Sequence, residues 1–390
     1  MKIATNILFI LLLTVLTTPC RAAQITVTAV NKLQLARANQ TIELTAEQLA
    51  PLGARELNTV HVKDSVGNEL ICQAVDTDFD ALHHADIVIF QADFAPGESK
   101  TFTVSTGAKQ EFTMEQFKAF GRFVRERFDD FAWENDRIAH RMYGKGLETW
   151  EGEPLSSSTI DIWSKSTPRM VINDWYLMDN YHEDHGEGAD FYSAGPTRGC
   201  GGNGLWANDR LWTSRNFSNS RVLANGPIRV MFELDYEPFD VNGMSVAETK
   251  RITLDAGQNL DHYQSFYKPY AGPGRSVPLT MAIGLKKVSG EQKELNTDHG
   301  WLAKWERMEK NAGNQGLAVI VDSKVFVNQA EDDLNWLVLT KVPSYNVGSY
   351  WSGFCWDKFG AIKDAEAWRK YVDEFAQGLQ SPIEVTVAAQ

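Results

Sequence analysis

Residues 226–236 read GPIRVMFELDY, and this stretch decides the fold class. Every second residue from 228 to 234 is apolar, whereas Arg229, Glu233 and Asp235 occupy positions between them. A period of two is typical of a β-strand that turns one face to a core and the other to solvent. The Gly-Pro pair ahead of it marks the turn from which the strand starts. The stretch therefore predicts a long strand of a half-buried sheet.

The pattern continues on the C-terminal side. Residues 248–255 alternate in the same way and are expected to be the neighbouring strand, and residues 277–285 and 317–321 add further strands. A weak helical pattern covers residues 297–311. A clear amphipathic helix is predicted only for residues 361–379. Its apolar side carries Ala365, Trp368, Tyr371, Val372 and Phe375.

On the N-terminal side the strands are shorter. Residues 25–30 and 41–44 alternate, residues 85–90 form a buried-strand run, and the chain becomes polar at 110–113. The sequence thus predicts an all-β protein. Residues 24–112 are expected to form a small β-sandwich domain, and residues 113–390 a large two-sheet sandwich with a C-terminal helix, which is the candidate catalytic domain.

The first 23 residues have the features of a signal peptide. Lys2 supplies the positive start, residues 7–16 are almost entirely apolar, and small residues follow near position 22. The apolar run is too short to span a bilayer, which needs about 20 residues. A lipoprotein box is disfavoured because Pro19 stands where a small residue is expected. We expect export to the periplasm and no membrane partner.

Charge and cysteine content restrict the partners and the redox chemistry. The formal charge of −13 argues against a nucleic-acid partner, whose phosphates require a basic face. It does not exclude an anionic small substrate, which responds to the local field. Beyond the signal peptide, Cys72, Cys200 and Cys355 allow at most one disulfide bridge, so the chain is not a disulfide scaffold.

Residues 131–212 mix polar, aromatic and glycine residues more densely than an ordinary core or surface. If residues 138–143 form a strand, His140 shares one face with Ile138 and Met142, and Arg141 lies on the other face. His140 then either meets a substrate on a concave surface or is a buried histidine bonded to a neighbour. Spacing alone leaves both interpretations open.

Residues 181–192, YHEDHGEGADFY, hold two imidazoles and four carboxylates interrupted by glycines. One interpretation is a divalent metal site, and the other is a histidine positioned by a carboxylate for acid or base catalysis. A solvated acidic loop is the structural alternative. The helical H-E-x-x-H zinc signature is absent. The candidate metal ligands are His182, Asp184, His185 and Glu187, with Asp190 next to them.

Residues 195–206, GPTRGCGGNGLW, form a glycine-rich stretch whose backbone is expected to approach a ligand closely. Arg198 suits a carboxylate because its guanidinium makes two parallel hydrogen bonds. The Lys-Ser/Thr ending of a phosphate loop is missing, so no nucleotide cofactor is predicted. Cys200 is expected to be a small packing residue in a tight turn.

Several of these segments also carry a family resemblance. They are 120–124, 129–137, 181–192, 197–202, 224–229 and the tryptophan-rich 350–358. Together they resemble the bacterial family called domain of unknown function 4861, which occurs in polysaccharide-degradation loci, over nearly all of the mature chain. The resemblance implies a galactose-mutarotase-like supersandwich. By similarity to the oligosaccharide dehydratase used in ulvan breakdown, it also implies action on a non-reducing-end uronic acid.

That reaction is loss of water across C4–C5, which leaves a 4,5-unsaturated uronate. It needs a cation or metal at the substrate carboxylate, a base for the C5 proton and an acid for the departing hydroxyl. The alternatives are a polysaccharide lyase, a glycoside hydrolase with paired carboxylates, and a periplasmic sugar-binding protein without catalysis. The expected partner is an anionic oligosaccharide substrate.

The chemistry of the side chains alone then suggests which residues act in catalysis and which bind the substrate. The candidate catalytic residues are His140, His182, His185 and Tyr192. The candidate substrate-binding residues are Trp133, Glu134, Arg137, Arg141, Tyr143, Arg198, Trp206 and Trp212.

Overall fold

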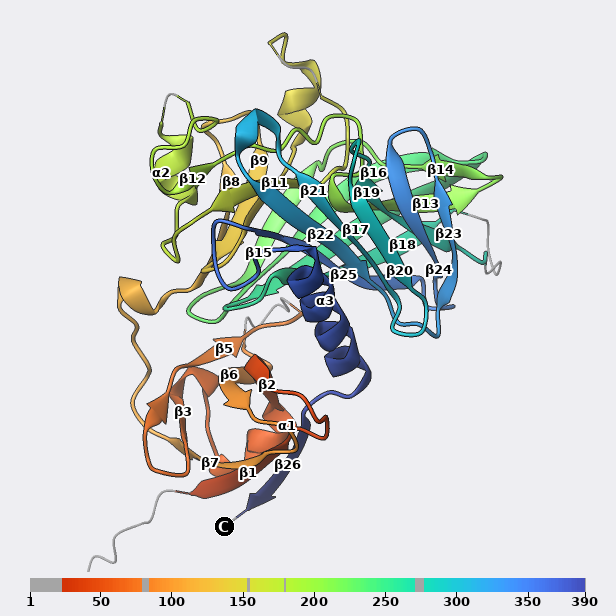
Figure 1. The fold of residues 1–390 in the computed structure, drawn as a ribbon. Helices are drawn as coiled ribbons and strands as arrows, with labels where there is room; N and C mark the ends of the chain where they lie inside the picture. The colour runs from red at the N-terminus through yellow and green to blue at the C-terminus, as the bar shows by residue number, and fades with distance from the viewer. Residues whose placement is uncertain (1–22, 79–83, 153–154, 179, 271–276, 390) are drawn as a thin grey trace, which may run out of the picture.

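The computed structural model describes residues 23–78, 84–152, 155–178, 180–270 and 277–389. The predicted signal peptide lies outside these residues, apart from Ala23. None of the described helices is both long and apolar enough to cross a membrane. Figure 1 shows a small N-terminal unit and a large strand-rich unit, with one long helix at their junction.

The small unit consists of two sheets around one core. A five-stranded sheet has the order β26-β1-β7-β3-β4, and a three-stranded sheet has the order β2-β6-β5. Ile25, Val62, Phe90 and Val104 are among the buried residues that fill the space between them. The strands are β1 (Gln24–Val30), β2 (Arg37–Thr45), β3 (Val60–Lys63), β4 (Glu69–Leu70), β5 (Cys72–Val75), β6 (Ile87–Phe94), β7 (Ser99–Thr106) and β26 (Glu384–Ala389).

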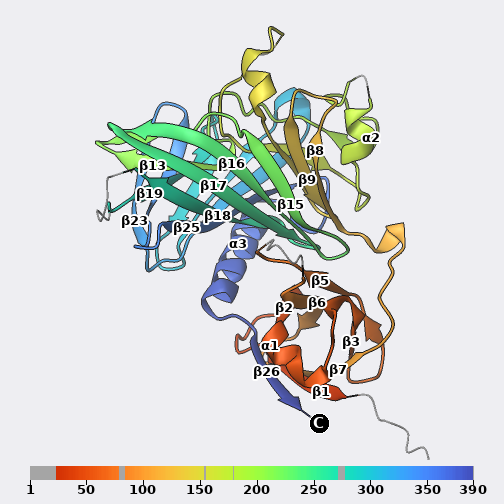
Figure 2. The same ribbon diagram turned by 180° about the vertical axis from the view of Figure 1, so that it is seen from behind.

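The C-terminal strand differs from its predicted place. The sequence assigned residues 384–389 to the large domain, whereas β26 pairs antiparallel with β1 along its whole length. Val385 and Val387 pack against the core of the small unit. β26 covers the free edge of β1, which removes an exposed strand edge. The return of the chain is visible in Figure 2, where β26 lies beside β1.

One layer of the large unit is an eight-stranded antiparallel sheet of order β15-β16-β17-β18-β25-β22-β21-β20. The fold-deciding stretch forms β16, which pairs with β17 as predicted. The strands are β15 (Asn219–Asn225), β16 (Arg229–Val241), β17 (Met244–Asp255), β18 (Leu260–Pro269), β20 (Gln292–Asn296), β21 (Trp301–Arg307), β22 (Asn314–Ile320) and β25 (Val347–Trp356).

Two five-stranded sheets form the opposite layer. Their orders are β12-β11-β10-β9-β8 and β14-β13-β19-β24-β23, and a parallel bridge between Ile160 and Gly199 connects them. The strands are β8 (Ala119–Val124), β9 (Asp130–Asn135), β10 (Ala139–Met142), β11 (Asp161–Lys165), β12 (Gly188–Ala189), β13 (Cys200–Ala207), β14 (Arg210–Trp212), β19 (Thr280–Lys286), β23 (Phe326–Glu331) and β24 (Asn335–Lys341).

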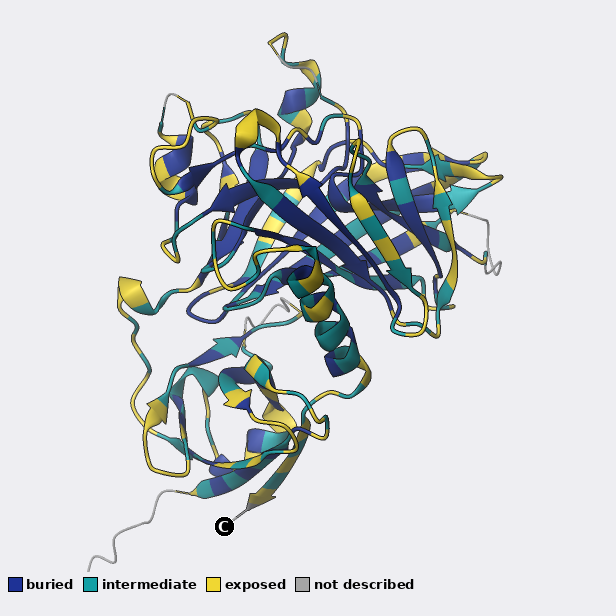
Figure 3. Ribbon diagram, in the orientation of Figure 1, coloured by how far each residue is buried: buried dark blue, intermediate teal, exposed yellow. Residues whose placement is uncertain are grey.

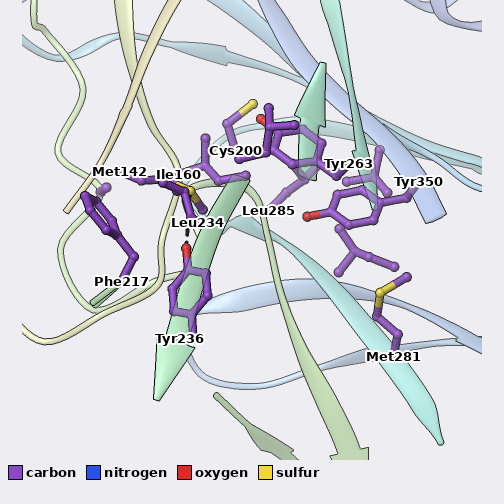
Figure 4. Close-up of a cluster of buried hydrophobic side chains, with 14 of the residues drawn as sticks. Met142, Ile160, Cys200, Phe217, Leu234, Tyr236, Tyr263, Met281, Leu285 and Tyr350 are labelled. Carbon is purple, nitrogen blue, oxygen red and sulfur yellow. Dashed lines mark hydrogen bonds between the residues drawn. The ribbon is translucent and has the colours of Figure 1, made fainter. Parts of the chain in front are cut away.

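All three sheets contribute to one core. Figure 4 shows Met142, Cys200 and Leu285 from the second layer meeting Tyr236 and Tyr350 from the first. In Figure 3 the buried residues follow the strands of this unit, and the exposed residues gather in turns and loops. Burying this continuous apolar surface is the main stabilising term of the fold.

Helix α3 (Ala365–Gln380) covers the outer face of the eight-stranded sheet. Asp364 caps it by accepting a hydrogen bond from the backbone N–H of Ala367 at 2.8 Å. Its buried Trp368 and Val372 pack on β21 and β22. The other helices are α1 (Ala46–Leu49) and α2 (Ile172–Tyr176), and 3₁₀ turns cover Ala50–Leu52, Leu57–Thr59, Met114–Gln116, Lys145–Thr149 and Glu309–Asn311.

The weak helical pattern at 297–311 does not correspond to an α-helix, because these residues contain β21. Trp301, Ala303 and Trp305 face α3, whereas Leu302 faces the central core, so both faces of the strand are buried. A strand buried on both faces lacks the period of two that identifies it. The predicted fold class is confirmed: an all-β chain with a small sandwich, a large supersandwich and a C-terminal helix.

Candidate functional site

Strand β10 sends consecutive side chains to opposite faces of its sheet, as the sequence predicted. His140 points between the two layers of the large unit, where it meets Asp261, and Arg141 points to the outer face, where it meets Asp161. The outer face is covered by α2 and by residues that follow it, Met178 and Tyr181 among them. Arg141 is therefore the centre of a polar cluster that is enclosed between a sheet and a loop.

Three carboxylates surround Arg141. Its Nε donates to Oδ2 of Asp161 at 2.6 Å, and its Nη2 donates to Oδ2 of Asp190 at 2.9 Å. Oδ2 of Asp130 lies 3.7 Å from Nη1. Tyr143 donates its hydroxyl to the same Asp161 oxygen at 3.1 Å. Each carboxylate comes from a different segment, so the cluster fixes β9, β11 and the loop relative to β10.

Burial changes the acidity of this cluster. It raises the pKa of the Asp130 carboxyl to about 7, with the charge of Arg141 acting in the opposite direction. Burial also raises the pKa of the Asp190 carboxyl. One oxygen of each of these two carboxyls has no hydrogen-bond partner among the described residues. Removal from water disfavours the ionised form of an acid, which explains both shifts.

Tyr181 and His182 lie where this cluster meets solvent. The hydroxyl oxygen of Tyr181 accepts a hydrogen bond from Nη1 of Arg141 at 3.2 Å. The two rings lie side by side, with their centroids 4.6 Å apart. The His182 side chain is 46% exposed, whereas those of Asp161 and Asp190 are fully buried. A substrate therefore reaches Tyr181 and His182 before it reaches any of these carboxylates.

The environments of Tyr181 and His182 shift their pKa values in opposite directions. Burial raises the pKa of the Tyr181 phenol, so it is protonated at neutral pH. Burial and the charges of Arg141 and Arg127 lower the pKa of the His182 imidazole, so it is neutral at the same pH. A protonated phenol beside a neutral imidazole is an acid next to a base.

A backbone carbonyl assigns the tautomer of His182. Its Nδ1 lies 3.1 Å from the carbonyl oxygen of Asp190. A carbonyl oxygen only accepts hydrogen bonds, so in the neutral ring Nδ1 carries the proton and Nε2 keeps the lone pair. His182 is thus held by the loop with its basic nitrogen available to a ligand.

An aromatic and cationic surface adjoins this pair. The Arg127 guanidinium lies 5.7 Å from the ring centroid of Tyr181 and 5.6 Å from that of Trp150. Trp150 stacks on Phe128 at 4.6 Å, and Phe128 is 44% exposed. Phe128 and Asp129 both have positive φ, at 32° and 64°. Two consecutive left-handed residues other than glycine are strained, and such strain is concentrated at functional sites.

The predicted metal ligands are not brought together. Asp184 accepts the backbone N–H groups of Gly186 and Gly188 and thereby closes the turn. Glu187 pairs with Arg169, and Nε2 of the exposed His185 lies 3.3 Å from the carbonyl oxygen of Asn180. Across the described ranges, one set of three potential ligands lies close enough together to share an ion: Asp76, Asp78 and Asp86 in the small unit. A divalent metal thus stays a prediction without an assembled site.

His140 does not face a cleft, contrary to one of the two interpretations of its pattern. It is 1% exposed, its Nε2 lies 3.0 Å from Oδ2 of Asp261, and its ring stacks on Trp133. The Trp133 indole donates to the other Asp261 oxygen at 2.7 Å. This trio connects the two layers of the sandwich. His140 and Trp133 are therefore structural residues that no substrate reaches in this structure.

Arg198 and its glycine neighbours also have a different role from the predicted one. Residues 200–207 form strand β13, not a ligand-binding loop, and Gly199 packs against the backbone of Ile160. Arg198 is 3% exposed and donates to the hydroxyls of Ser157 and Ser158. Burial lowers its pKa to about 10. The glycines permit close approach of protein backbone rather than of a ligand.

The other predicted residues are dispersed. Glu134 is buried against Lys165 and accepts hydrogen bonds from two backbone N–H groups at the N-terminus of α2. Tyr192 is buried under Lys286. Trp206 and Trp212 belong to the β13–β14 hairpin, at the opposite end of the unit from α2 (Figure 1). Arg137 is half-buried beside Gly360. Cys72, Cys200 and Cys355 are buried free thiols.

The structure thus unites Arg141, Tyr143 and His182 from the predicted set and adds residues that sequence reasoning left out. Tyr181 was missed although it directly precedes His182, because the two histidines dominated the pattern. Asp130 and Asp161 were missed because they stand far apart in the chain, whereas Asp190 had been noted only beside the candidate metal ligands. The added residues are Arg127, Phe128, Asp130, Trp150, Asp161 and Tyr181.

Comparison with known proteins shows that the chain has relatives. The model of the family described as "Domain of unknown function (DUF4861)" matches residues 30–385, which confirms the resemblance found in the sequence. "Uncharacterized protein P7" from Formosa agariphila is 30% identical over 379 residues, covering 93% of each chain.

Two solved structures from Enterococcus faecalis are similar at lower identity. One is an α-mannosidase, with 10% identity and a TM-score of 0.47, which matches 94% of this chain and 46% of its own. The other is a protein in glycosyl hydrolase family 38, with 11% identity and a TM-score of 0.48, which matches 95% of this chain and 48% of its own. The chain spans about half the length of each of these two solved chains.

Proposed function

We propose that this chain, which belongs to the family described as domain of unknown function 4861, is a carbohydrate-processing enzyme of the hydro-lyase class. The proposed reaction removes water across C4–C5 of a uronic acid at the non-reducing end of an oligosaccharide and gives a 4,5-unsaturated uronate. The observation that carries the proposal is the Tyr181–His182 pair, whose pKa values are shifted in opposite directions beside Arg141.

The reaction requires a base for the C5 proton. In the proposal, Nε2 of His182 takes this proton, because the Asp190 carbonyl holds the proton of the ring on Nδ1. The C5–H bonding electrons form the C4=C5 double bond as the C4–O bond breaks. A lowered pKa keeps the imidazole in its basic form at neutral pH.

The departing 4-hydroxyl requires an acid because hydroxide leaves poorly. Tyr181 is the proposed donor: its oxygen accepts from Arg141, which leaves its own proton for the substrate. Once the proton has moved, the phenolate is paired with the Arg141 guanidinium at a distance of 3.2 Å. Charge that develops on the oxygen is therefore stabilised by a cation already in position. Transfer of a proton from His182 to Tyr181 through solvent restores the starting state.

The substrate carboxylate needs a cation so that the C5 proton becomes acidic enough to remove. Arg127 is the proposed partner, since it borders both Tyr181 and the Phe128–Trp150 surface and is more exposed than Arg141. The Phe128–Trp150 surface then offers an apolar face for the sugar ring. In this assignment the buried aspartates hold Arg141 and do not touch the substrate.

The buried aspartates also favour elimination over glycoside hydrolysis. Hydrolysis uses two carboxyl groups that flank the scissile bond. Asp161 and Asp190 are fully buried and both bind Arg141. Together with the predicted signal peptide, the proposal places the enzyme in the periplasm, acting on anionic oligosaccharides released from a polysaccharide.

The test is incubation with saturated uronate-ended oligosaccharides, with ultraviolet absorbance and product mass recorded together. The expected result is new absorbance with loss of one water from the intact oligosaccharide. Absorbance with chain shortening would identify a polysaccharide lyase, and shortening without absorbance would identify a hydrolase. Binding without any product, across substrates that differ in their terminal uronate, would identify a sugar-binding protein. Each of these three results contradicts the dehydratase.

A further inference from the structure

A cavity of about 660 Å³ lies between the small unit, helix α3 and the outer face of the eight-stranded sheet. Its volume is in the range of pockets that hold small molecules. The candidate catalytic cluster lies elsewhere, on the outer face of the β8–β12 sheet, and contributes no residue to the cavity. We propose that this cavity is a binding site for a neutral mono- or disaccharide, separate from the site of catalysis.

The floor of the cavity is a regular polar surface. Thr253 of β17 pairs with His262 of β18, which pairs with Trp351 of β25. In the next row, Arg251 pairs with Gln264. These side chains all belong to the face of the sheet that points away from the core, and all are partly exposed. Three adjacent strands therefore present a flat row of hydrogen-bonding groups to the cavity.

Two of these groups are available to a ligand. Within the described part of the chain, neither the amide of Gln264 nor the hydroxyl of Thr253 has a hydrogen-bond partner, although both line the cavity. An amide offers a donor and an acceptor in one plane, and a hydroxyl offers both on one atom. Sugar hydroxyls also donate and accept at once, so these two side chains match their chemistry.

The charged groups of the wall are already paired. Arg229 binds Asp255 at 2.6 Å and also pairs with Glu43, and Arg251 binds Glu233 at 2.6 Å. Arg37 donates to the carbonyl oxygens of Gly378 and Ser381 at the end of α3. A wall whose cations are matched by anions and carbonyls does not attract a strongly charged ligand. This favours a neutral sugar over a uronate or a phosphate.

An aromatic wall completes the cavity. Trp351 stacks on His262 with ring centroids 4.4 Å apart, and Tyr371 and Phe375 of α3 stand next to them. Burial lowers the pKa of His262 to about 4, so the stacked imidazole is neutral at physiological pH. A pyranose has an apolar face of C–H groups and a polar rim. An aromatic wall beside a polar sheet face offers a surface for each.

The ligand would also connect the two units. Asn39 and Thr41 of β2 line the cavity, and Thr41 donates to Asp255 of the large unit at 2.8 Å. A molecule bound there contacts both units in the folded state only. Binding of such a ligand therefore raises the unfolding temperature of the protein once the ligand concentration exceeds the dissociation constant.

The test is titration of the full mature chain with neutral hexoses, pentoses, deoxyhexoses and their disaccharides. Calorimetry and unfolding temperature are recorded, with galacturonate as the charged comparison. We expect a neutral sugar to bind with a dissociation constant of about 1 mM or tighter. Gln264→Leu and Thr253→Val should each weaken binding at least about tenfold, by removing hydrogen bonds to the sugar. Lys268 lies on the same face of β18 outside the cavity, so Lys268→Ala should leave sugar binding unchanged.

His182→Ala separates this inference from the proposed function, because it removes the proposed base and leaves the cavity intact. Retained neutral-sugar binding in His182→Ala supports a second site, whether or not the protein is a dehydratase. The inference is overturned if no neutral sugar in the panel binds with a dissociation constant of about 1 mM or tighter, or if the folded Gln264→Leu and Thr253→Val variants bind as the parent does. It is also overturned if His182→Ala abolishes the binding.

Discussion

The hydroxyl oxygen of Tyr181 accepts a hydrogen bond from Nη1 of Arg141 at 3.2 Å, and the same guanidinium binds Asp161 and Asp190. A cation that is buried and shared in this way has a fixed position, because moving it would leave buried carboxylates unpaired. In the proposed reaction, Tyr181 thus stands beside a cation that is already in place when its phenolate forms.

His182→Ala should lower kcat/KM for uronate-ended oligosaccharides by about 10²–10⁴, because it removes the proposed base. The unfolding temperature should hardly change, since the side chain is 46% exposed. His185→Ala is the matched control: it lies three residues away in the same loop and is exposed. Equal losses in the two variants would show that the loop as a whole matters and that His182 is not the base.

The pH dependence of kcat/KM should have a broad plateau with two limbs. The acid limb should have its midpoint below the ordinary histidine value of 6.5, because the pKa of His182 is lowered and its protonation removes the lone pair. The alkaline limb should lie above 10, because the pKa of Tyr181 is raised and its ionisation removes the proton to be donated. Tyr181→Phe should be far less active and should lack the alkaline limb. An unchanged alkaline limb in that variant would assign it to another group.

His140→Ala should reduce stability, not catalysis. The substitution removes a buried ring that stacks on Trp133 and lies 3.0 Å from Oδ2 of the fully buried Asp261, and leaving that buried polar group without this neighbour costs about 1–3 kcal/mol of unfolding free energy. Adding Asp261→Asn should recover part of this loss by removing the buried carboxyl group. Chemical denaturation of the single and double variants measures both effects. A stable His140→Ala variant with abolished activity would instead restore a catalytic role for His140.

Removal of divalent metal should leave activity intact. The predicted ligands His182, Asp184, His185 and Glu187 have separate partners in the loop, and the proposed acid and base need no ion. Elemental analysis after purification without added metal, followed by chelation and re-addition, measures the effect. Activity that is lost on chelation and restored by a dication would mean that the loop rearranges to hold the metal that the sequence suggested.

Val385→Ser combined with Val387→Ser should destabilise the small unit, because these two side chains of β26 pack against its core. A loss of about 2 kcal/mol or more is expected from apolar burial. The control combines Thr386→Ser with Ala388→Ser, at the exposed positions of the same strand. Equal effects would mean that β26 contributes only through its backbone pairing with β1.

The sequence by itself determined the elements whose period is visible within one segment. The alternation at 226–236 predicts β16, and the amphipathic pattern at 361–379 predicts α3, because one face of each element is apolar and the other is polar. It also determined that His140 and Arg141 point to opposite faces of one strand, since this follows from local geometry alone. The family resemblance came from long local motifs in the same way.

Only the tertiary structure decided which face of that strand carries the candidate site. His140 entered the interior because Asp261, 121 positions later in the chain, came to lie 3.0 Å from it. Arg141 became the centre of a cluster because Asp130, Asp161 and Asp190 converge from separate segments. Likewise, β26 joined the small unit through pairing with β1 at the far end of the chain. Such contacts depend on the packing of distant segments, and no local period in a sequence records which segments will meet.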